Sequence, residues 1–350
     1  MEPSRFTFLN LSQLIHHHLL WFLISAYAIA AMFPTPGLWI RKLSFGDAFI
    51  FGTKVHLSLV LILLATLMFN AGLGIRTAHL SSLLRKLGVL GAGLAANLLI
   101  PIGFILCVSI LLALWHNPEE AQQILVGLAL IAAMPIAGAS TAWAQNSNGN
   151  LVLSLGLVLL STIFSPIITP LSLYVFGEMA SAEYETVLRN LADHGSGAFL
   201  GVWVVLPSLM GVGVRFAISG QLSAVMPYIK TINSLVLLVL NYSNASVSLP
   251  QAIAHPDVDF LALTFVITAG LCVTTFAAAY WLSCVFETDQ ADRISLMYGL
   301  GMNNNGTGLV LASLSLASFP RVMVPIIFYN LVQHVVAGSV HHVLGRKEAT

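Results

Sequence analysis

Two polar interruptions lie inside long apolar stretches of this chain. Residues 133–142 read Ala-Met-Pro-Ile-Ala-Gly-Ala-Ser-Thr-Ala, and residues 300–308 read Leu-Gly-Met-Asn-Asn-Asn-Gly-Thr-Gly. Within a membrane, every backbone N–H and C=O must find a partner inside the protein, so non-helical backbone survives there only where it is buried or lines a cavity. The two interruptions therefore predict a polar binding site inside the membrane, one of the features of a transporter built from two repeats.

The first interruption has the residues needed to break a helix. Pro135 cannot donate a backbone hydrogen bond, and Gly138, Ser140 and Thr141 supply flexibility and hydroxyl groups. A helix broken here ends in carbonyls, which suit a cation, and resumes with amides, which suit an anion. A simple proline kink, with the hydroxyls bonded back to their own helix, is the alternative.

The second interruption places three amide side chains in a row. Asn303, Asn304 and Asn305 cannot all face one side of a helix, and amides at membrane depth are costly unless they are paired. They predict a solute or ion site. Ser154 should lie near the first interruption, because a short turn joins its apolar run to the preceding one. His334 lies in the middle of the last apolar run, where a buried, satisfied histidine is the alternative to a site residue.

The composition is that of a polytopic membrane protein. The 350 residues are 57% hydrophobic and 8% charged, the mean hydropathy is +0.89, and the formal net charge is zero, which gives no reason to expect a nucleic-acid partner. A membrane-spanning helix needs about 20 residues. On that measure ten spans are expected, at residues 12–34, 56–74, 87–115, 122–143, 150–177, 195–214, 225–248, 260–285, 294–316 and 321–344.

These spans form two groups of five, residues 1–177 and 195–350, separated by a polar linker at 178–194. An odd number of spans per group makes the second group enter from the opposite side, which predicts an all-α fold with inverted repeats. The run near residues 19–32 could instead be a secretory signal, but its removal would leave an odd number of spans. We therefore keep it as the first helix.

The distribution of basic residues predicts the orientation. Lys and Arg are more frequent in cytoplasmic loops. With both termini inside, nine basic residues face the cytoplasm and five face outward. The inner ones are Arg5, Arg76, Arg85, Lys86, Arg215, Lys230, Arg293, Arg346 and Lys347, and the outer ones are Arg41, Lys42, Lys54, Arg189 and Arg321. We expect an inner (plasma) membrane protein with both termini in the cytoplasm, and the loop at 35–54 along the membrane interface.

Acidic residues are absent from the middle of every expected span. The pairs Glu119/Glu120 and Asp257/Asp259 fall between spans, and we expect them to be solvated. The sequence also lacks a nucleophile-and-base arrangement, a phosphate loop and a plausible metal spacing, since the triplet at 16–18 would point its histidines in different directions. These observations indicate neither an enzyme nor a resident cofactor, and they give no sign of an obligate protein partner.

Several ordered motifs resemble the bile acid:sodium symporter family, in its bacterial form, between about Leu67 and Ser339. Residues 67–74 are similar to the family's M-F-G-M-G-L, residues 134–141 to C-P-G-G-T-A-S-N, and residues 161–170 to S-T-x-x-x-P-x-x-T-P. Residues 301–306 stand where the family has G-M-Q-N-S-G. His334, Gly338 and Ser339 fit its W-H-N-x-x-G-S.

The resemblance implies that helices four and nine are broken and cross beside the solute and sodium sites. It implies a core of helices three to five and eight to ten, and a panel of helices one, two, six and seven. Its first sodium site would use Ser140, Thr141 and Ser154, and its second would use Asn303. The family's threonine ligand falls on Val158 and its shared glutamate on Gly299. The expected solute residues are Asn303, Asn304, Asn305, Thr141 and His334.

The expected function is secondary active transport of a small organic anion, either a carboxylate or a bile-acid-like solute, by alternating access in the lipid bilayer. Sodium is the expected coupling ion. A sodium-independent uniporter or a differently coupled carrier on the same fold is the first alternative. A membrane sensor that binds a solute without transporting it is the second.

Overall fold

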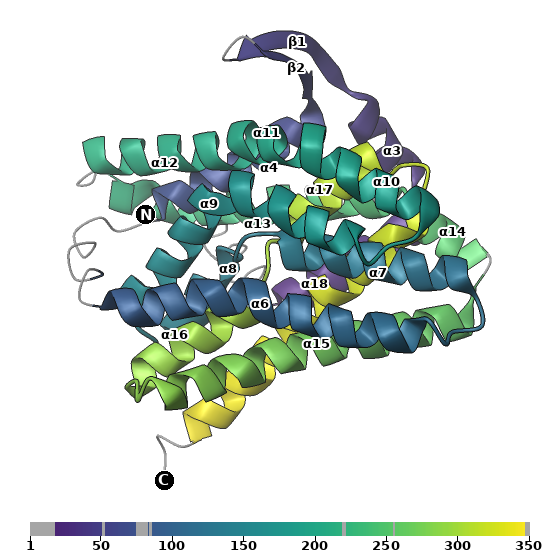
Figure 1. Ribbon diagram of the computed structural model, residues 1–350. Coiled ribbons are helices and arrows are strands. Elements are labelled where there is room, and N and C mark those ends of the chain that lie inside the picture. Colours follow the sequence, from purple (N-terminus) through teal and green to yellow (C-terminus); the bar gives the residue numbers. More distant parts are fainter. Residues whose placement is uncertain are drawn as a thin grey trace. The chain divides into compact units, whose positions relative to one another are not determined.

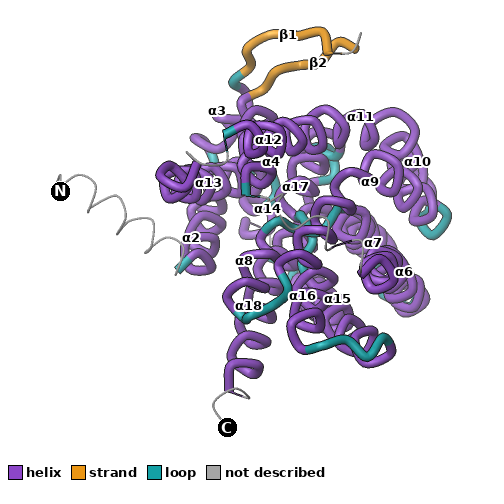
Figure 2. The backbone as a smooth tube through the Cα atoms, turned by 90° about the vertical axis from the view of Figure 1, so that its left-hand side faces the viewer, coloured by secondary structure: helices purple, strands orange, loops and turns teal. Residues whose placement is uncertain are grey.

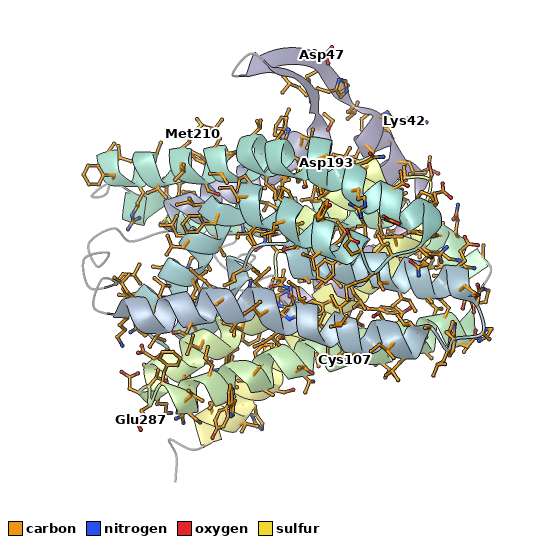
Figure 3. All side chains as sticks on the ribbon, in the orientation of Figure 1. Lys42, Asp47, Cys107, Asp193, Met210 and Glu287 are labelled. Atoms are coloured by element: carbon orange, nitrogen blue, oxygen red, sulfur yellow. The ribbon has the colours of Figure 1, made fainter. Side chains whose placement is uncertain are left out.

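The computed structural model describes residues 18–50, 53–74, 83, 86–218, 222–254 and 256–346 (Figure 1). Among these, five helices are long and apolar enough to cross a membrane. They are Leu87–Leu112, Leu151–Gly177, Ser196–Ala217, Val258–Val285 and Pro320–Leu344. Their outer surfaces carry apolar side chains, such as Met210 and Cys107, which point away from their helices (Figure 3). The expectation of an all-α polytopic membrane protein is confirmed at this level.

The chain divides into two compact units. Unit 1 comprises residues 1–76 and 201–255, and unit 2 comprises residues 77–200 and 256–350. This grouping does not test whether residues 1–177 and 195–350 are repeats, so that division stays a prediction. The polar linker expected at 178–194 is largely helical, because α10 (Ala182–Asn190) lies within it. Arg189 on α10 pairs with Glu178 and Glu185.

Unit 1 consists of helices and one hairpin. Its elements are α2 (Leu19–Met32), α3 (Thr35–Lys42), β1 (Ser44–Ile50), β2 (Thr53–Ser58), α4 (Leu59–Leu73), η4 (Gly201–Val205), α12 (Leu206–Ala217), α13 (Leu222–Ala245) and α14 (Leu249–Ala254). Helices α2 and α3 meet at 92°. Both are bonded to α13, through Tyr27 to Asn241 at 2.8 Å and Arg41 to Asn244 at 2.7 Å.

The hairpin was not expected from the sequence. The segment 35–54 was predicted to be an interfacial loop, but it forms α3 and most of an antiparallel β1–β2 pair that stands out from α3 and α4 (Figure 2). The second span was predicted from residue 56. It begins at Leu59, because β2 extends to Ser58 and the Ser58 side chain caps α4 by accepting from the Leu61 amide.

Within unit 1, α4 and α12 touch backbone to backbone at two glycines. An ideal Cβ on Gly72 would lie 2.0 Å from the Ser208 carbonyl oxygen, and one on Gly211 would lie 2.1 Å from that of Phe69. Real Cβ atoms do not approach backbone this closely, so the contact requires glycine at both places. Small residues commonly permit such approaches between membrane helices.

Unit 2 contains both polar interruptions. Its elements are α6 (Leu87–Leu112), α7 (Pro118–Ala133), α8 (Ala139–Asn146), α9 (Leu151–Gly177), α10, η3 (Leu191–Gly195), α11 (Ser196–Leu200), α15 (Val258–Val285), α16 (Gln290–Gly301), α17 (Asn305–Ser315), η5 (Pro320–Val322) and α18 (Met323–Arg346). Most residues of α7, α16 and α17 are buried, so these short helices form much of the interior of the unit. The longer α6 and α15 run side by side at the edge of the unit (Figure 1).

The acidic pairs do not behave as expected. Glu119 is exposed, but Glu120 retains only 4% of its accessible surface, so the prediction that both are solvated is wrong for Glu120. Asp257 is partly buried and caps α15, whereas Asp259 is exposed. Position between spans was a poor guide for Glu120, because Trp115, Asn117 and Arg321 surround its carboxylate.

We predict that Gly211→Ala destabilises the protein, because its methyl group would collide with the α4 backbone. Overpacking of this kind costs about 1–3 kcal/mol. The matched control is Gly213→Ala on the same helix, where an added Cβ meets no atom within 4 Å. Alanine favours a helix over glycine, so the control should leave the thermal midpoint unchanged or raise it slightly. Equal midpoints for the two variants in detergent would contradict the close contact.

Candidate functional site

Both predicted helix breaks are present in unit 2. Helix α7 ends at Ala133 and α8 starts at Ala139, while α16 ends at Gly301 and α17 starts at Asn305. A proline kink would let one helix continue through Pro135. The gap between Ala133 and Ala139 shows that the chain instead leaves the helix and begins a new one.

The two breaks meet and bond to each other. Ile136 and Asn303 form an antiparallel bridge. The Ala137 amide donates to the Met302 carbonyl at 2.8 Å, and the Asn304 amide donates to the Pro135 carbonyl at 2.8 Å. Each break therefore supplies the backbone partners that the other lost when its helix ended. We call this pair of segments, residues 134–138 and 302–304, the crossing.

Hydroxyl groups of α9 satisfy further backbone groups of the first break. In an intact helix the Ile136 amide would donate to the Ala132 carbonyl, but here it donates to Ser161 Oγ at 3.1 Å. Thr169 Oγ1 donates to the Ala133 carbonyl. Ser161 is the first residue of the S-T-x-x-x-P motif. The hydroxyls of Ser161 and Thr169 therefore satisfy backbone groups of the first break.

An amide network supports the second break. Gln333 Oε1 on α18 accepts from the Asn303 backbone amide at 3.1 Å and from Asn305 Nδ2 at 2.9 Å. Asn303 Nδ2 donates to the Ile131 carbonyl at 3.0 Å, and the Asn304 side chain caps α17 by accepting from Thr307 N. Gln333 was not expected from the sequence to be a site residue, although this residue immediately precedes His334.

His334 itself is buried in α18, with 9% of its surface exposed. This burial is compatible with a structural histidine and with a residue of the solute site, so a role in solute binding stays a prediction.

Unpartnered oxygen atoms concentrate around the crossing. Twelve buried side-chain N or O atoms of the described residues have no hydrogen-bond partner, and four of them lie at or beside the crossing: Ser140 Oγ, Asn303 Oδ1, Asn305 Oδ1 and Thr307 Oγ1. An unsatisfied buried polar atom costs about 1–3 kcal/mol, and native proteins contain few of them. Two of these atoms are amide oxygens, which can only accept, so the crossing is rich in acceptors for a cation or for a hydrogen-bond donor.

The residues of the expected first sodium site lie together. Ser154 Oγ on α9 donates to Thr141 Oγ1 on α8 at 3.1 Å, and Ser140 precedes Thr141. The expectation that Ser154 lies close to the first break is therefore confirmed. Asn303 belongs to the other segment of the crossing. Whether these four residues bind sodium stays a prediction.

A leucine occupies the space beside the glycine at the family's glutamate position. An ideal Cβ on Gly299 would lie 2.9 Å from Leu157 Cδ1, and one on Gly93 would lie 3.0 Å from Leu157 Cδ2. Leu157 is fully buried between these two glycines. No group of three or more His, Cys, Asp or Glu side chains that could hold a metal ion occurs in the described part of the chain. Ser140, Thr141, Ser154 and Asn303 carry neutral oxygens, so a cation bound by these four residues would have no carboxylate ligand among them.

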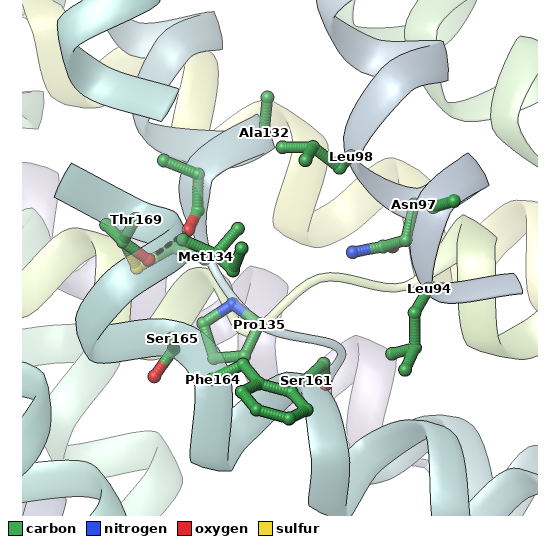
Figure 4. A pocket seen from close by; sticks show the side chains of 13 residues that line it. Leu94, Asn97, Leu98, Ala132, Met134, Pro135, Ser161, Phe164, Ser165 and Thr169 are labelled. Carbon is green, nitrogen blue, oxygen red and sulfur yellow. Dashed lines mark hydrogen bonds between the residues drawn. The ribbon is translucent and has the colours of Figure 1, made fainter. Parts of the chain in front are cut away.

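A cavity of about 210 Å³ adjoins the first break between α6, α7 and α9. Its walls are mostly apolar, and its polar groups include Asn97, Ser161, Ser165 and Thr169 (Figure 4). The Asn97 side chain points toward Met134 and Pro135, and its Oδ1 atom is buried without a partner. The cavity could hold the apolar part of a small solute close to the crossing.

The hairpin of unit 1 contains a serine, a histidine and an aspartate in hydrogen-bond contact. Ser44 Oγ lies 2.9 Å from His56 Nε2, and His56 Nδ1 lies 2.9 Å from Asp47 Oδ1, the atom order of a serine-hydrolase triad. The His56 and Asp47 side chains are 62% and 38% exposed. Water therefore competes for these bonds, and we assign the three residues to the stability of the hairpin.

Comparison with known proteins gives two matches. The model of the Sodium Bile acid symporter family matches residues 61–254, more than half of the chain. The chain is also 28% identical over 227 residues to the uncharacterised protein YbaS of Bacillus subtilis (strain 168), which covers 64% of this chain and 70% of that protein.

We predict that Ser161→Ala destabilises the first break, because the Ile136 amide loses its acceptor. A buried donor left unpaired costs about 1–3 kcal/mol. Ser172→Ala is the matched control, since Ser172 Oγ lies on the same helix and donates only to the Ile168 carbonyl of that helix. Thermal unfolding in detergent should show a larger loss for Ser161→Ala. An equal or smaller loss than in the control would show that Ser161 does not support the break.

Proposed function

Because the chain belongs to the Sodium Bile acid symporter family, we propose that it is a secondary transporter of a small organic anion, such as a carboxylate or a bile-acid-like solute. Transport would proceed by alternating access. The observation that carries this proposal is the crossing, where two broken helices pair with each other and four buried oxygens lack partners. Four of the twelve buried side-chain N or O atoms without a partner in the described residues lie at or beside this one place, which supports a ligand there.

The proposed architecture has ten membrane-spanning helices in two inverted repeats. The order of helices around the two breaks of unit 2 supports this architecture. Helices α7 and α8 flank the first break and are followed by the long α9, and helices α16 and α17 flank the second break and are followed by the long α18. We place the protein in the inner (plasma) membrane with both termini in the cytoplasm, on the nine-to-five distribution of basic residues.

The site we propose combines the crossing with its neighbouring cavity. The first-turn amides of α8 and α17 lie at the positive ends of their helices, which favour an anionic group. The apolar walls of the cavity beside Asn97 would receive the hydrocarbon part of the solute. This arrangement favours an amphipathic anion over a fully polar one.

Sodium is the coupling ion we propose, held by Ser140, Thr141, Ser154 and Asn303. The unpartnered oxygens of Ser140 and Asn303 support this assignment. Neutral ligands bind a cation less tightly than a carboxylate does, so we expect weak sodium binding that strengthens when the anionic solute is present. A sodium-independent carrier is the second candidate, and it is favoured by the packing of Leu157 against Gly299.

We predict that Ser140→Ala and Asn303→Ala each weaken solute uptake by at least tenfold, because each removes a buried oxygen from the crossing. Uptake of radiolabelled carboxylates into proteoliposomes measures this effect. Ser109→Ala is the control, since that serine lies on an exposed face of α6 and donates to its own helix. Unchanged uptake in both crossing variants would place the solute site elsewhere.

The coupling ion has a separate test. We predict that replacing sodium by choline in the uptake buffer lowers uptake by wild-type protein at least fivefold. A Gly299→Glu variant should lose thermal stability because of the contact with Leu157, and adding Leu157→Ala should restore that stability and tighten sodium binding. Equal uptake in sodium and choline would rule out sodium coupling and support the second candidate.

A further inference from the structure

Two buried carboxylates occupy the same position in the two broken helices. Glu120 is the third residue of α7, and Asp292 is the third residue of α16. Each retains only 4% of its accessible surface. A carboxylate in a first turn is favoured by the positive end of the helix. Burial of a charge is nevertheless expensive unless the charge is paired and hydrogen-bonded, so the partners of both groups matter.

Glu120 accepts hydrogen bonds from its own half of the chain and forms an ion pair with the C-terminal half. Its carboxylate accepts from Trp115 Nε1 at 2.9 Å and from Asn117 Nδ2 at 2.7 Å, and it lies 3.8 Å from Arg321 Nη1. Arg321 lies in η5, directly before α18. Its Nη1 also donates at 3.2 Å to Asp257, the residue that caps α15. Through Arg321, Glu120 thus ties α7 to the starts of α18 and α15.

Asp292 makes the reciprocal connections. It forms an ion pair with Lys86, the residue before α6, and accepts from Asn150 Nδ2 at 2.7 Å. Asn150 caps α9, and its backbone amide donates to the Ala291 carbonyl at 2.9 Å. Ser295 Oγ on α16 also donates to the Asn150 carbonyl at 2.8 Å. Asp292 thus ties α16 to the starts of α9 and α6, which belong to the N-terminal half.

We propose that Glu120 and Asp292 are positioning residues that hold the outer ends of the two broken helices, and so keep the crossing in register. The inference deepens the proposed function, on which it rests, by naming residues that act on the site from a distance. Arg321 links the start of α7 to the C-terminal half of the chain, and Lys86 and Asn150 link the start of α16 to the N-terminal half. Each broken helix is therefore held at two places, at its outer end and at the crossing.

Helix length explains why an outer anchor affects the crossing. Helix α7 has 16 residues, and at 1.5 Å per residue it is about 24 Å long. A tilt of about 5° at its outer end would move its inner end by about 2 Å. The two backbone bonds of the crossing are each 2.8 Å long, and a hydrogen bond is lost well before an extension of that size.

Removal of either charge should loosen its anchor. Loss of one partner from a buried ion pair leaves the other charge uncompensated. The chain offers two matched controls, each next to or near its test residue and of the same chemistry. Asp289 is 65% exposed and caps α16, a role that asparagine also fills. It also lies 3.7 Å from Lys86, but an exposed ion pair of this kind contributes little, so Asp289→Asn tests loss of charge near Lys86 without loss of the buried carboxylate. Glu119 is exposed on the first turn of α7.

Hydrogen exchange of the full chain in nanodiscs, followed by mass spectrometry well below the unfolding temperature, tests the proposal. In Asp292→Asn and in Glu120→Gln, the Ala137 and Asn304 amides should exchange at least tenfold faster than in wild type, while the middles of α6 and α15 stay protected. Asp289→Asn and Glu119→Gln should match wild type. If one test variant does not fold, the other is judged alone.

Two results would overturn the proposal. Unchanged exchange at Ala137 and Asn304 would show that the outer ends do not control the crossing. Faster exchange spread equally over α6 and α15 would show that the carboxylates stabilise the unit as a whole without positioning the breaks. Hydrogen exchange is measured without solute or sodium. A negative result would therefore reject the positioning role of Glu120 and Asp292 without rejecting transport, which the uptake measurements test separately.

Discussion

The structure of unit 2 depends on one constraint: a helix that ends inside a membrane leaves backbone groups that water cannot reach. Two helices end there, α7 at Ala133 and α16 at Gly301. Each break supplies donors and acceptors to the other through the Ile136–Asn303 bridge. Neither break could be satisfied in this way alone, which explains why the two interruptions occur together in one chain.

Side chains around the breaks form hydrogen bonds with backbone groups that the bridge does not satisfy. Ser161 and Thr169 on α9 serve the first break, and Gln333 on α18 serves the second. The side-chain oxygens that still lack partners are then the groups free to bind a ligand. Where the family resemblance places a glutamate, this chain has Gly299, and Leu157 packs against it. The ligand that we propose at the crossing would therefore be bound by neutral oxygens and helix ends.

Much of this arrangement could be predicted from the sequence. Pro135 and the run Asn303 to Asn305 marked both breaks, because proline and adjacent amides are incompatible with a continuous helix in lipid. The proximity of Ser154 to Thr141 followed from the short turn between their helices. These features depend on local chemistry, which a single sequence records directly.

Features that depend on packing between distant residues could not be predicted. Glu120 seemed solvated because it lies between spans, but its burial is set by Trp115 and Arg321, the latter far away in the chain. Gln333 gave no signal beyond its neighbour His334. The β1–β2 hairpin was missed because its alternating residues were read as an interfacial loop.

The central claim is that a solute binds at the crossing. A structure determined experimentally with a transported solute bound tests it most directly. We expect density for the solute between the two breaks, within hydrogen-bond distance of groups that include Ser140 Oγ and Asn303 Oδ1. Density for the solute elsewhere in the protein, with both of these oxygens still buried and unpartnered, would contradict it.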